Sequence, residues 1–480
     1  MKITLLLKFP AAWLLIILPV SFALRISNLN YNTPFLDEAQ YIVLGRKVLA
    51  GHWQESDPFS WVGGLPLIYP PLAALFGAFG IFGARFLNVL FGTMSVYLLY
   101  LFAARLHLSK NQKTNGIIGL VSASFLGIMT IPLYLSRLAI YDMPSFTFFL
   151  LGLIILQRAL LIKKPLLWQQ ENGFFASSFF FLLSFLTKYT TFIFFPFILL
   201  WAYNASRKSG KVVLTRYLKY FAAILITGTL LYFSWRFDAL SHFLKEQVGA
   251  SKNQSLPIIT QFTKFSLPML FPAVLTILLF LSKRKFPHPF TMLLIGAMVV
   301  PLIHLATNNI KAVNQQVFLS LIFLLPLSAY FFTYIWERFR LIGGFILPLF
   351  LITVFVISQN QLRQLETSWS NTQKIMDFLK SVTTGHEKIL SFEDDVTKLS
   401  LTNLPENNIT GIYSFTYQGL SDENAYSQAV KDGYFNFILY NQDLNEPVKE
   451  IVKTALSNHY RQIYQENHHF TLFRLEEKTV

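Results

Sequence analysis

Residues 9–41, FPAAWLLIILPVSFALRISNLNYNTPFLDEAQY, join a long apolar stretch to an acidic pair. The apolar part, residues 9–27, approaches the roughly 20 residues with which a helix crosses a bilayer. No small-residue cleavage site follows it, so we interpret it as an uncleaved first membrane span. Asp37 and Glu38 then stand where the chain leaves the bilayer. Charges placed there cost desolvation free energy, so the pair calls for a structural or functional reason.

The composition is that of a polytopic membrane protein. The 480 residues are 53% hydrophobic and include 49 Phe, and only 14% are charged, against about 25% in an average soluble domain. Long apolar runs recur along the chain, which excludes a globular enzyme with one large core. Cysteine is absent, which excludes disulfides and thiolate metal sites.

Charge is distributed unevenly along the chain. Residues 1–360 carry 29 basic and 9 acidic groups, whereas residues 361–480 carry 11 basic and 16 acidic groups. The basic residues of the first part lie in short runs between apolar segments. That placement is typical of cytoplasmic loops under the positive-inside rule and argues against a nucleic-acid partner.

The apolar ranges and the basic runs together predict a topology. Six basic runs fall at alternate connections, which predicts a cytoplasmic N-terminus, an external C-terminus and about 11 transmembrane helices in the cell membrane. Residues 173–204 are short for two crossings, so the helices there are expected to be short, broken or tilted. The predicted spans are 9–27, 84–106, 115–135, 138–162, 173–187, 189–204, 212–235, 262–282, 289–307, 316–336 and 341–358.

Two regions are expected outside the cytoplasm. The loop 25–83 has an amphipathic helical pattern from Glu38 to Ala50 and a short apolar stretch, Leu72 to Phe82, that is expected to lie at the membrane interface. Residues 361–480 are polar and alternate between strand-like and helical patterns. We therefore predict a membrane domain over 1–360 and a small extracytoplasmic α/β domain over 361–480.

Asp37 and Glu38 are the first candidates for chemistry. Asp37 is a good N-cap residue, so a purely structural role is one interpretation. Two adjacent carboxylates exceed what a cap requires. In a low-dielectric cavity one of them would have a raised pKa, which suits a base that deprotonates a hydroxyl.

Further candidates lie at other external span ends. Arg137 and Asp142 flank the start of the fourth span, and Lys188 with Tyr189 lies between the two short apolar segments of 173–204. One interpretation is structural: ion pairs, or side chains that snorkel to the interface. The other brings Asp142 beside Asp37 and lets the cations meet a phosphate.

His304 and Lys311 bracket a further external turn, although a lone histidine is more often structural. The acidic residues could in principle ligate a divalent metal. We favour a site without cofactors, in which basic side chains neutralise a leaving phosphate.

The motifs together resemble the GT-C glycosyltransferases of the protein O-mannosyltransferase and aminoarabinose-transferase families. The resemblance covers residues 1–210 best. It rests on Leu36-Asp37-Glu38-Ala39, Tyr69-Pro70-Pro71-Leu72, Phe82-Gly83-Ala84-Arg85-Phe86, Arg137 with Asp142, and Leu186-Thr187-Lys188-Tyr189, followed by the external C-terminal domain.

The resemblance implies a GT-C fold and an enzyme that moves a sugar from a polyprenyl-phosphate carrier to an extracytoplasmic acceptor on a protein, lipid or glycan. It implies an inverting displacement in which Asp37 activates the acceptor, while Glu38 and Asp142 shape the site. Arg137, Lys188 and Lys311 are then candidates to hold the carrier phosphate, with Tyr69, Tyr189 and His304 as further substrate contacts.

Two positions depart from the relatives, and two other function classes stay open. Tyr69 stands where many relatives have a basic residue before Pro-Pro, and Lys311 is the only cation where they often have an Arg-Tyr pair. A transporter or flippase of lipid-linked sugars is one alternative, which predicts charges near span midpoints and broken helices around a cavity. A non-catalytic membrane scaffold is the other.

Overall fold

In this computed structural model two compact units are formed. The first unit comprises Met1–Leu29 and Val48–Leu365, and the second comprises Asn30–Lys47 and Glu366–Val480. The structure describes residues 10–52, 63–161, 167–238, 241, 255–283, 287–310, 312–413, 415–443, 449–450, 452–453, 456, 459–466 and 469–476. The functional division at residue 360 stays a prediction, and the second unit takes in an early segment that the predicted boundary leaves with the membrane domain.

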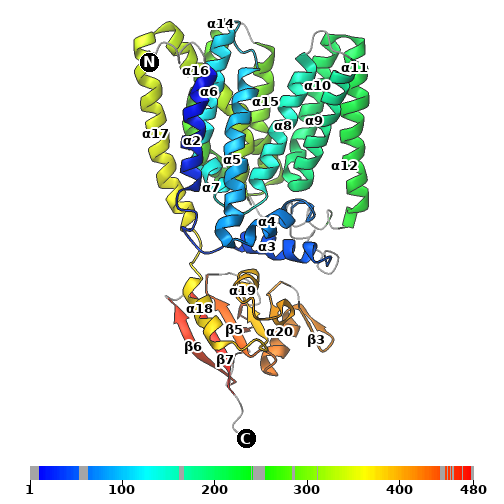
Figure 1. Ribbon diagram of the computed structural model, residues 1–480, viewed down its shortest axis with the longest axis vertical. Coiled ribbons are helices and arrows are strands. Elements are labelled where there is room, and N and C mark those ends of the chain that lie inside the picture. Colours follow the sequence, from blue (N-terminus) through cyan, green and yellow to red (C-terminus); the bar gives the residue numbers. More distant parts are fainter. Residues whose placement is uncertain are drawn as a thin grey trace. The chain divides into compact units, whose positions relative to one another are not determined.

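The first unit is a bundle of helices (Figure 1). In chain order these are η1 (Pro10–Trp13), α2 (Leu14–Ile26), α4 (Tyr69–Gly77), α5 (Gly80–Ala104), α6 (Gln112–Ile128), α7 (Thr130–Ser136), α8 (Asp142–Leu161), α9 (Leu167–Thr187), η3 (Tyr189–Phe194), α10 (Phe195–Ser209), α11 (Lys211–Tyr217), η4 (Leu218–Ala222), α12 (Ala223–Trp235), α14 (Ser255–Lys283), α15 (His288–Thr307), α16 (Val313–Arg338) and α17 (Arg340–Glu366).

The protein is a multi-pass membrane protein. Among the described residues, seven helices are long and apolar enough to cross a membrane, or eight if the bent pair α6–α7 forms one span. Each of the eleven predicted apolar ranges overlaps a helix or a run of helices. The count of eleven crossings itself stays a prediction.

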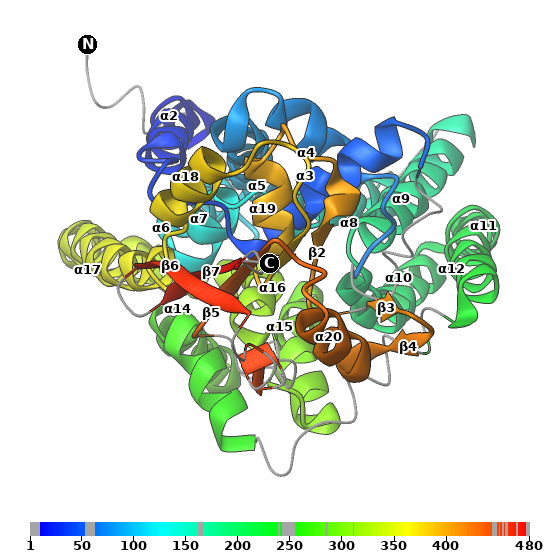
Figure 2. The same ribbon diagram turned by 90° about the horizontal axis from the view of Figure 1, so that it is seen from below.

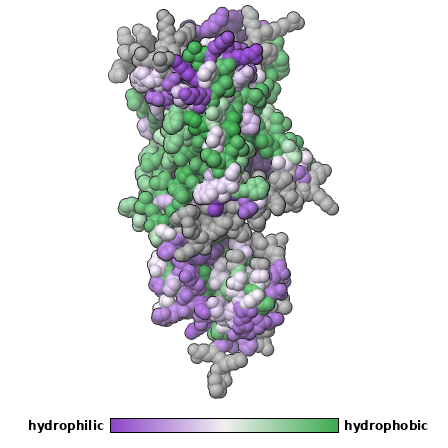
Figure 3. Space-filling view, turned by 90° about the vertical axis from the view of Figure 1, so that its right-hand side faces the viewer, coloured by the Kyte–Doolittle hydropathy of each residue, from purple (hydrophilic) through white to green (hydrophobic). Residues whose placement is uncertain are grey.

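Basic residues gather at one end of this bundle. Lys113 lies in the first turn of α6, Lys208 lies in the last turn of α10, and Arg338 and Arg340 flank the α16–α17 turn. These helix ends are all at the upper end of the bundle in Figure 1, and Figure 3 shows a hydrophobic band over the helices with hydrophilic residues at that end. The arrangement is typical of a cytoplasmic face, so the predicted orientation remains our proposal.

A sharp bend separates α6 from α7, and a buried arginine donates hydrogen bonds to the carbonyls that the bend leaves unpaired in the helix. The two helices are inclined by 61° at Met129, which leaves the last carbonyls of α6 without helical partners. Arg25 donates to two of them, Leu126 O at 3.2 Å and Gly127 O at 3.1 Å. Its Nε also donates to Ser136 Oγ in α7 at 3.1 Å. A cation is electrostatically favourable at the C-terminus of a helix, so Arg25 stabilises the bend.

The second unit is built on a five-stranded sheet in the order β2-β1-β5-β7-β6. Strand β1 pairs in parallel with β2 and β5, whereas β7 pairs antiparallel with β5 and β6. Figures 1 and 2 show this sheet with helices beside it. The elements are α3 (Leu36–Leu49), α18 (Gln373–Val382), β1 (Ile389–Ser391), α19 (Asp394–Ser400), η5 (Glu406–Asn408), β2 (Ile409–Thr410), β3 (Thr416–Tyr417), β4 (Leu420–Ser421), α20 (Asp422–Lys431), β5 (Phe437–Asn441), β6 (Tyr460–Glu466) and β7 (Phe470–Leu475).

The early segment Asn30–Lys47 folds as part of this unit. Ala39 of α3 is fully buried in the same apolar cluster as Ile389 and Phe437 of the sheet. The side-chain amide of Asn32 donates to the carbonyls of Glu366 and Trp369 at 3.3 and 3.1 Å. Trp369 Nε1 donates in return to Thr33 O at 3.1 Å. The chain therefore contributes to the second unit about 320 residues before the rest of that unit follows.

The C-terminal pattern was predicted in part. The sequence pattern predicts strands near 387–392, 434–440, 459–464 and 469–474, and each of these ranges overlaps an observed strand, while the predicted strand 409–415 shortens to β2. Helices α19 and α20 and the hairpin β3–β4 were not predicted. The predicted helix at 445–456 lies largely outside the described residues.

Candidate active site

Asp37 and Glu38 lie in the first turn of α3, in the second unit. The helix begins at Leu36, so Asp37 is inside it rather than at its N-cap. Glu38 performs the capping instead, since its Oε2 accepts a hydrogen bond from Phe35 N at 2.9 Å. This is the return half of a capping box, made by a glutamate three residues into the helix. Glu38 thereby has a structural function, whereas Asp37 is half-buried beside it.

Asp142 and Lys188 form a buried ion pair in the first unit, although 46 residues separate them in sequence. Asp142 is the first residue of α8, and Lys188 directly follows the end of α9. Their side chains are 2% and 4% exposed. The ammonium of Lys188 also lies 4.9 Å from the ring centroid of Tyr141. An ammonium has three donors, so this cation can bind a further acceptor while it stays paired.

Hydroxyl groups fix the two helices that carry this pair. Ser184 of α9 donates to the carbonyl of Ser145 in α8 at 2.8 Å, and Ser145 donates to the carbonyl of Ser184 at 2.9 Å. Asn88 of α5 donates to the carbonyls of Leu138 and Ile140, in the loop that leads into α8. These reciprocal bonds set the register of the helix ends and so the position of Asp142.

A segment of the predicted loop 25–83 packs on the turn that contains Lys188. Leu65 N donates to Leu186 O, and Tyr189 N donates to Gly63 O, each at 2.6 Å. A Cβ on Gly64 would lie 2.1 Å from the carbonyl oxygen of Thr187, so only glycine permits this approach. The Gly63-Gly64 pair therefore joins the predicted loop 25–83 to the lysine turn.

Tyr189 supports the same turn from the other side. Its hydroxyl lies 2.5 Å from the hydroxyl of Tyr232 in α12, and both rings pack edge-on or tilted against Phe185. Tyr189 and the adjacent Lys188 are both buried. Tyr189 is thus both a candidate substrate contact and a structural member of the turn.

Arg137 is anchored to the end of α2. One of its guanidinium nitrogens donates to the carbonyl of Leu24 and to Ser27 Oγ, the latter at 2.9 Å. It directly follows α7, whose bend Arg25 stabilises. The functional role predicted for Arg137 stays a prediction.

The remaining predicted substrate contacts lie in three places. Tyr69 is the first residue of α4 and is buried, and Pro70 and Pro71 follow it in the first turn of that helix. His304 is bonded within the α15–α16 turn: Nδ1 lies 2.6 Å from Asn309 O, and Nε2 lies 3.0 Å from Gln316 Oε1. These bonds give His304 a structural role in closing the turn. Lys311 lies outside the described residues.

Residues that the sequence did not single out hold this region together, namely Arg25, Asn88 and Tyr232. The sequence contains a signal for Arg25, because an arginine two residues before the end of the apolar range 9–27 needs hydrogen-bond acceptors. The Gly63-Gly64 break is visible in the sequence, but its contact with the turn between α9 and η3 is not.

A second group of charges lies on α19 of the second unit. Lys398 Nζ contacts Asp394 Oδ2 at 2.6 Å and Asp395 Oδ1 at 3.2 Å. Burial raises the pKa of Asp395 to about 6, the charge of Asp394 adds to this, and Lys398 opposes it. Burial likewise raises the pKa of Glu393 to about 7, against the hydrogen bond donated by Asn441. These carboxyl groups therefore titrate closer to neutrality than free ones.

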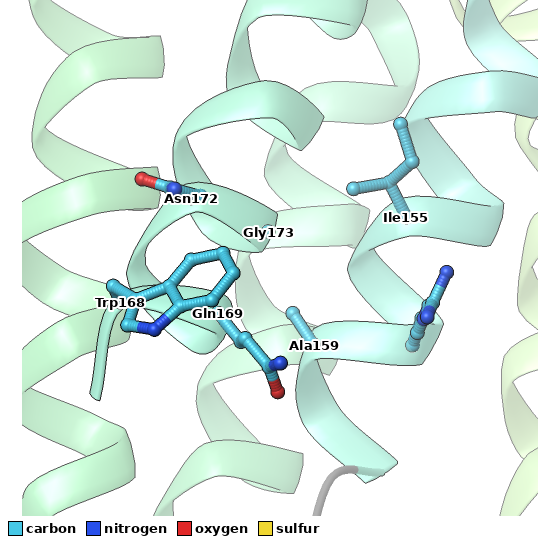
Figure 4. Close-up of a pocket in the computed structure, with 7 residues that line it drawn as sticks. Ile155, Ala159, Trp168, Gln169, Asn172 and Gly173 are labelled. Atoms are coloured by element: carbon cyan, nitrogen blue, oxygen red, sulfur yellow. The ribbon is translucent and has the colours of Figure 1, made fainter. Parts of the chain in front are cut away.

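A cavity of about 370 Å³ between α8 and α9 is remote from the ion pair. It is lined by Ile155, Arg158, Ala159, Trp168, Gln169, Asn172 and Gly173 (Figure 4). Ile155 lies 13 residues after Asp142, which corresponds to about 20 Å along a helix. The cavity is at the opposite ends of these helices and does not belong to the candidate site.

Comparisons with known proteins agree with this architecture. A family model described as dolichyl-phosphate-mannose-protein mannosyltransferase matches residues 71–241. A search of curated protein sequences gives no significant match. The structure is similar to that of ArnT from Cupriavidus metallidurans in the apo state, with 12% identity and a TM-score of 0.66 over 96% of this chain and 98% of that one.

Two further solved structures contain lipid phosphates. ArnT from Cupriavidus metallidurans bound to undecaprenyl phosphate is 11% identical, with a TM-score of 0.62 over 98% of each chain. The archaeal oligosaccharyltransferase AglB from Archaeoglobus fulgidus, in complex with an inhibitory peptide and a dolichol-phosphate, is 12% identical, with a TM-score of 0.58 over 98% of this chain and 74% of that one. The predicted resemblance to GT-C glycosyltransferases is confirmed, and the chain has their fold.

Proposed function

We propose that this chain, with its GT-C glycosyltransferase fold, transfers a sugar from a polyprenyl-phosphate carrier to an extracytoplasmic acceptor. The family model supports this, and so do the lipid phosphates bound by the two structural neighbours. The observation that carries the proposal is the buried Asp142–Lys188 pair at the external ends of α8 and α9. A buried pair is a weak source of stability, because desolvation opposes its Coulomb attraction. In this proposal the pair is therefore retained for its function.

In our proposal Lys188 receives the carrier phosphate. Asp142 orients the ammonium, and Tyr141 lies against it, so one or two N–H donors can be directed at phosphate oxygens. A fixed cation in a low-dielectric environment stabilises the charge that develops on a leaving phosphate more strongly than water does. Arg137 and Lys311 are the other cations proposed for this role, with Tyr69, Tyr189 and His304 as neighbouring contacts.

Asp37 is proposed as the base. An acceptor hydroxyl attacks the anomeric carbon, its proton passes to the Asp37 carboxylate, and the bond from that carbon to the phosphate oxygen breaks. The electron pair of that bond leaves with the polyprenyl phosphate, and the anomeric configuration inverts. Glu38 keeps α3 in position through its cap. No step of this proposal requires a metal or another cofactor.

The orientation belongs to the same proposal. The N-terminus and the basic helix ends face the cytoplasm, and residues 361–480 form an extracytoplasmic domain. The catalytic domain is residues 1–360. A carrier that stays in the bilayer can then deliver its sugar to a carboxylate outside the cytoplasm.

The test is a transfer assay with purified protein in lipid and radiolabelled polyprenyl-phosphate sugars. We expect transfer or slow donor hydrolysis by the wild type, and a loss of about 100-fold or more in Asp37→Asn and Lys188→Met. The control is Lys208→Met, which removes an exposed lysine from the last turn of α10 and should retain activity.

Three outcomes contradict parts of the proposal. Equal transfer by Asp37→Asn excludes Asp37 as the base. Equal transfer by Lys188→Met excludes its role at the phosphate. If the wild type neither transfers nor hydrolyses any donor but moves a fluorescent donor between leaflets, the transporter alternative holds.

A further inference from the structure

An apolar groove runs along the side of the helical unit between α2, α6, α16 and α17. Its main part has a volume of about 750 Å³. A second cavity of about 280 Å³ continues it and shares Ile16, Ile17, Ser124 and Leu351 with the first. The continuation extends to Ser21 and Gly127, both of which are bonded to Arg25. The groove thus follows α2 for much of its length.

The groove exists because α17 stands apart from the bundle. Of the most apolar window in α17 only 17% is buried, against 78% in α16. Figure 2 shows α17 at the periphery of the helical unit. In a bilayer no water is available to fill such a furrow, and an unfilled one forfeits dispersion contacts. Lipid chains are the apolar material that the surroundings supply.

Three attachments keep α17 at this distance. At its start, a Cβ on Gly343 would lie 2.6 Å from the Cα of Trp336, so the two backbones are in close contact. In the middle, the Phe350 ring packs 4.7 Å from the Phe332 ring. Near its end, Gln361 accepts from Thr130 Oγ1 at 2.6 Å and donates to the carbonyl of Lys264 at 3.0 Å. The groove is therefore fixed by contacts on either side of it.

Positive charge and tryptophan mark one end of the groove. Lys113 and Arg340 both line it and both are exposed, so their charged groups are accessible. Trp13 and Trp336 line the same cavity, and tryptophan favours the level of lipid headgroups. Glu337 is the nearby carboxylate, and it accepts a hydrogen bond from Thr114.

This cationic end is opposite to the Asp142–Lys188 pair. Lys113 is near the start of α6 and Asp142 near the end of the α6–α7 segment, at the start of the next helix. A phosphate held at Lys113 and Arg340 is therefore at the far membrane face from the proposed site.

We propose that this groove is a binding site for one anionic glycerophospholipid. Its phosphate binds Lys113 and Arg340, and an acyl chain lies along Ile16, Ile17 and Leu351. The two cations favour an anionic headgroup over a zwitterionic one. The groove contacts the acyl chain of the bound lipid, a contact that a lipid in the bulk bilayer does not make. This inference does not depend on the proposed glycosyltransferase activity.

Native mass spectrometry of the full-length protein tests the site. The delipidated protein is incubated with phosphatidylglycerol or phosphatidylcholine of the same acyl chains, and the bound lipids are counted. We expect one phosphatidylglycerol to be retained at least tenfold more tightly than phosphatidylcholine. The double variant Lys113→Gln/Arg340→Gln should lose this preference.

Two further variants separate the headgroup from the chain. Lys208→Gln/Lys211→Gln removes the same charge from exposed lysines at other helix ends and should keep the preference. Ser124→Phe fills the groove but leaves both cations in place. It should weaken the binding of phosphatidylglycerol at least fivefold.

Each contrary result overturns the proposal. Equal retention of the two lipids excludes headgroup selection. If Lys208→Gln/Lys211→Gln loses the preference for phosphatidylglycerol as completely as Lys113→Gln/Arg340→Gln, the preference is due to the overall charge of the protein and not to this groove. Unchanged binding in Ser124→Phe excludes the groove. Displacement of the phospholipid by an equimolar polyprenyl phosphate would assign the groove to the carrier instead.

Discussion

The buried cations Arg25 and Lys188 are satisfied in opposite ways. The guanidinium of Arg25 is surrounded by neutral oxygens, namely carbonyls at the broken end of α6 and the hydroxyls of Ser21 and Ser136. The ammonium of Lys188 is paired with the carboxylate of Asp142 and lies against an aromatic ring. Both groups are almost fully buried.

The difference indicates a structural role for Arg25 and is consistent with the chemical role proposed for Lys188. Arg25 has its donors committed to acceptors that the α6–α7 bend creates, so its function is to stabilise that bend. Lys188 has three N–H donors and, among the described residues, one carboxylate partner, so it keeps donor capacity for a further acceptor. A cation of the second kind is suited to bind and release an anion.

The largest expected effect is on transfer by the double variant Asp142→Asn/Lys188→Met. It should lose at least about 100-fold of the transfer rate, because the cation proposed for the phosphate is gone. Its thermal stability in detergent should stay close to that of the wild type, since no unpaired charge remains.

Lys188→Met alone is the matched control for stability. It leaves the Asp142 carboxylate buried without its ammonium, which should cost about 3–5 kcal/mol. If the double variant is as unstable as the single one, the pair is structural and the contrast with Arg25 fails.

The second effect is on stability. Arg25→Met leaves the carbonyls of Leu126 and Gly127 without their donor, so we expect a loss of about 3 kcal/mol in the free energy of unfolding. Transfer per folded molecule should fall by less than about threefold. Denaturant unfolding followed by circular dichroism measures the first quantity, and the transfer assay measures the second. A large loss of activity in a stable Arg25 variant would place this arginine with Lys188 in function.

The third effect tests the loop that docks on the lysine turn. Gly64→Ala puts a Cβ against the carbonyl of Thr187, so the loop must move and transfer should fall about tenfold. Gly344→Ala is the control, because its Cβ would make only an ordinary contact of 3.7 Å with Trp336. Equal activity in both alanine variants would show that the loop does not influence Lys188.

The smallest effect concerns the tyrosine pair behind the turn. Tyr189→Phe removes one hydrogen bond and leaves the hydroxyl of Tyr232 without it, at a cost of about 1 kcal/mol in stability. The double variant Tyr189→Phe/Tyr232→Phe should recover part of that cost, which a thermal-shift series can measure. A loss of transfer well beyond the loss of stability would instead assign Tyr189 to the substrate.

Much of the membrane unit could be predicted because each span requires about 20 consecutive apolar residues, a signal that is easy to recognise in the sequence. Each apolar range of about 20 residues overlaps observed helices, and the basic residues Lys113, Lys208 and Arg338 lie in the terminal turns of helices. The 61° bend at Met129 could not be predicted, because neither proline nor glycine stands at Met129 and Arg25 stabilises the bend from another helix.

The candidate site was predicted as residues but not as geometry. Asp142 and Lys188 were each selected for their place at a span end, and their pairing depends on how α8 packs on α9. The role of Glu38 as a cap depends on a helix that begins two residues earlier than the pattern indicated. His304 attracted attention as a titratable side chain, although its ring nitrogens are bonded within a turn.

The early segment Asn30–Lys47 imposes an order on the synthesis of this protein. A ribosome makes α3 soon after the first span, but the strands that bury Ala39 are made last. During most of translation this helix has none of those partners, and the loop that must close to seat it is several hundred residues long. Contacts of such sequence separation form slowly. Every chain that ends before these strands therefore contains α3 without the residues that bury Ala39 and with an incomplete second unit.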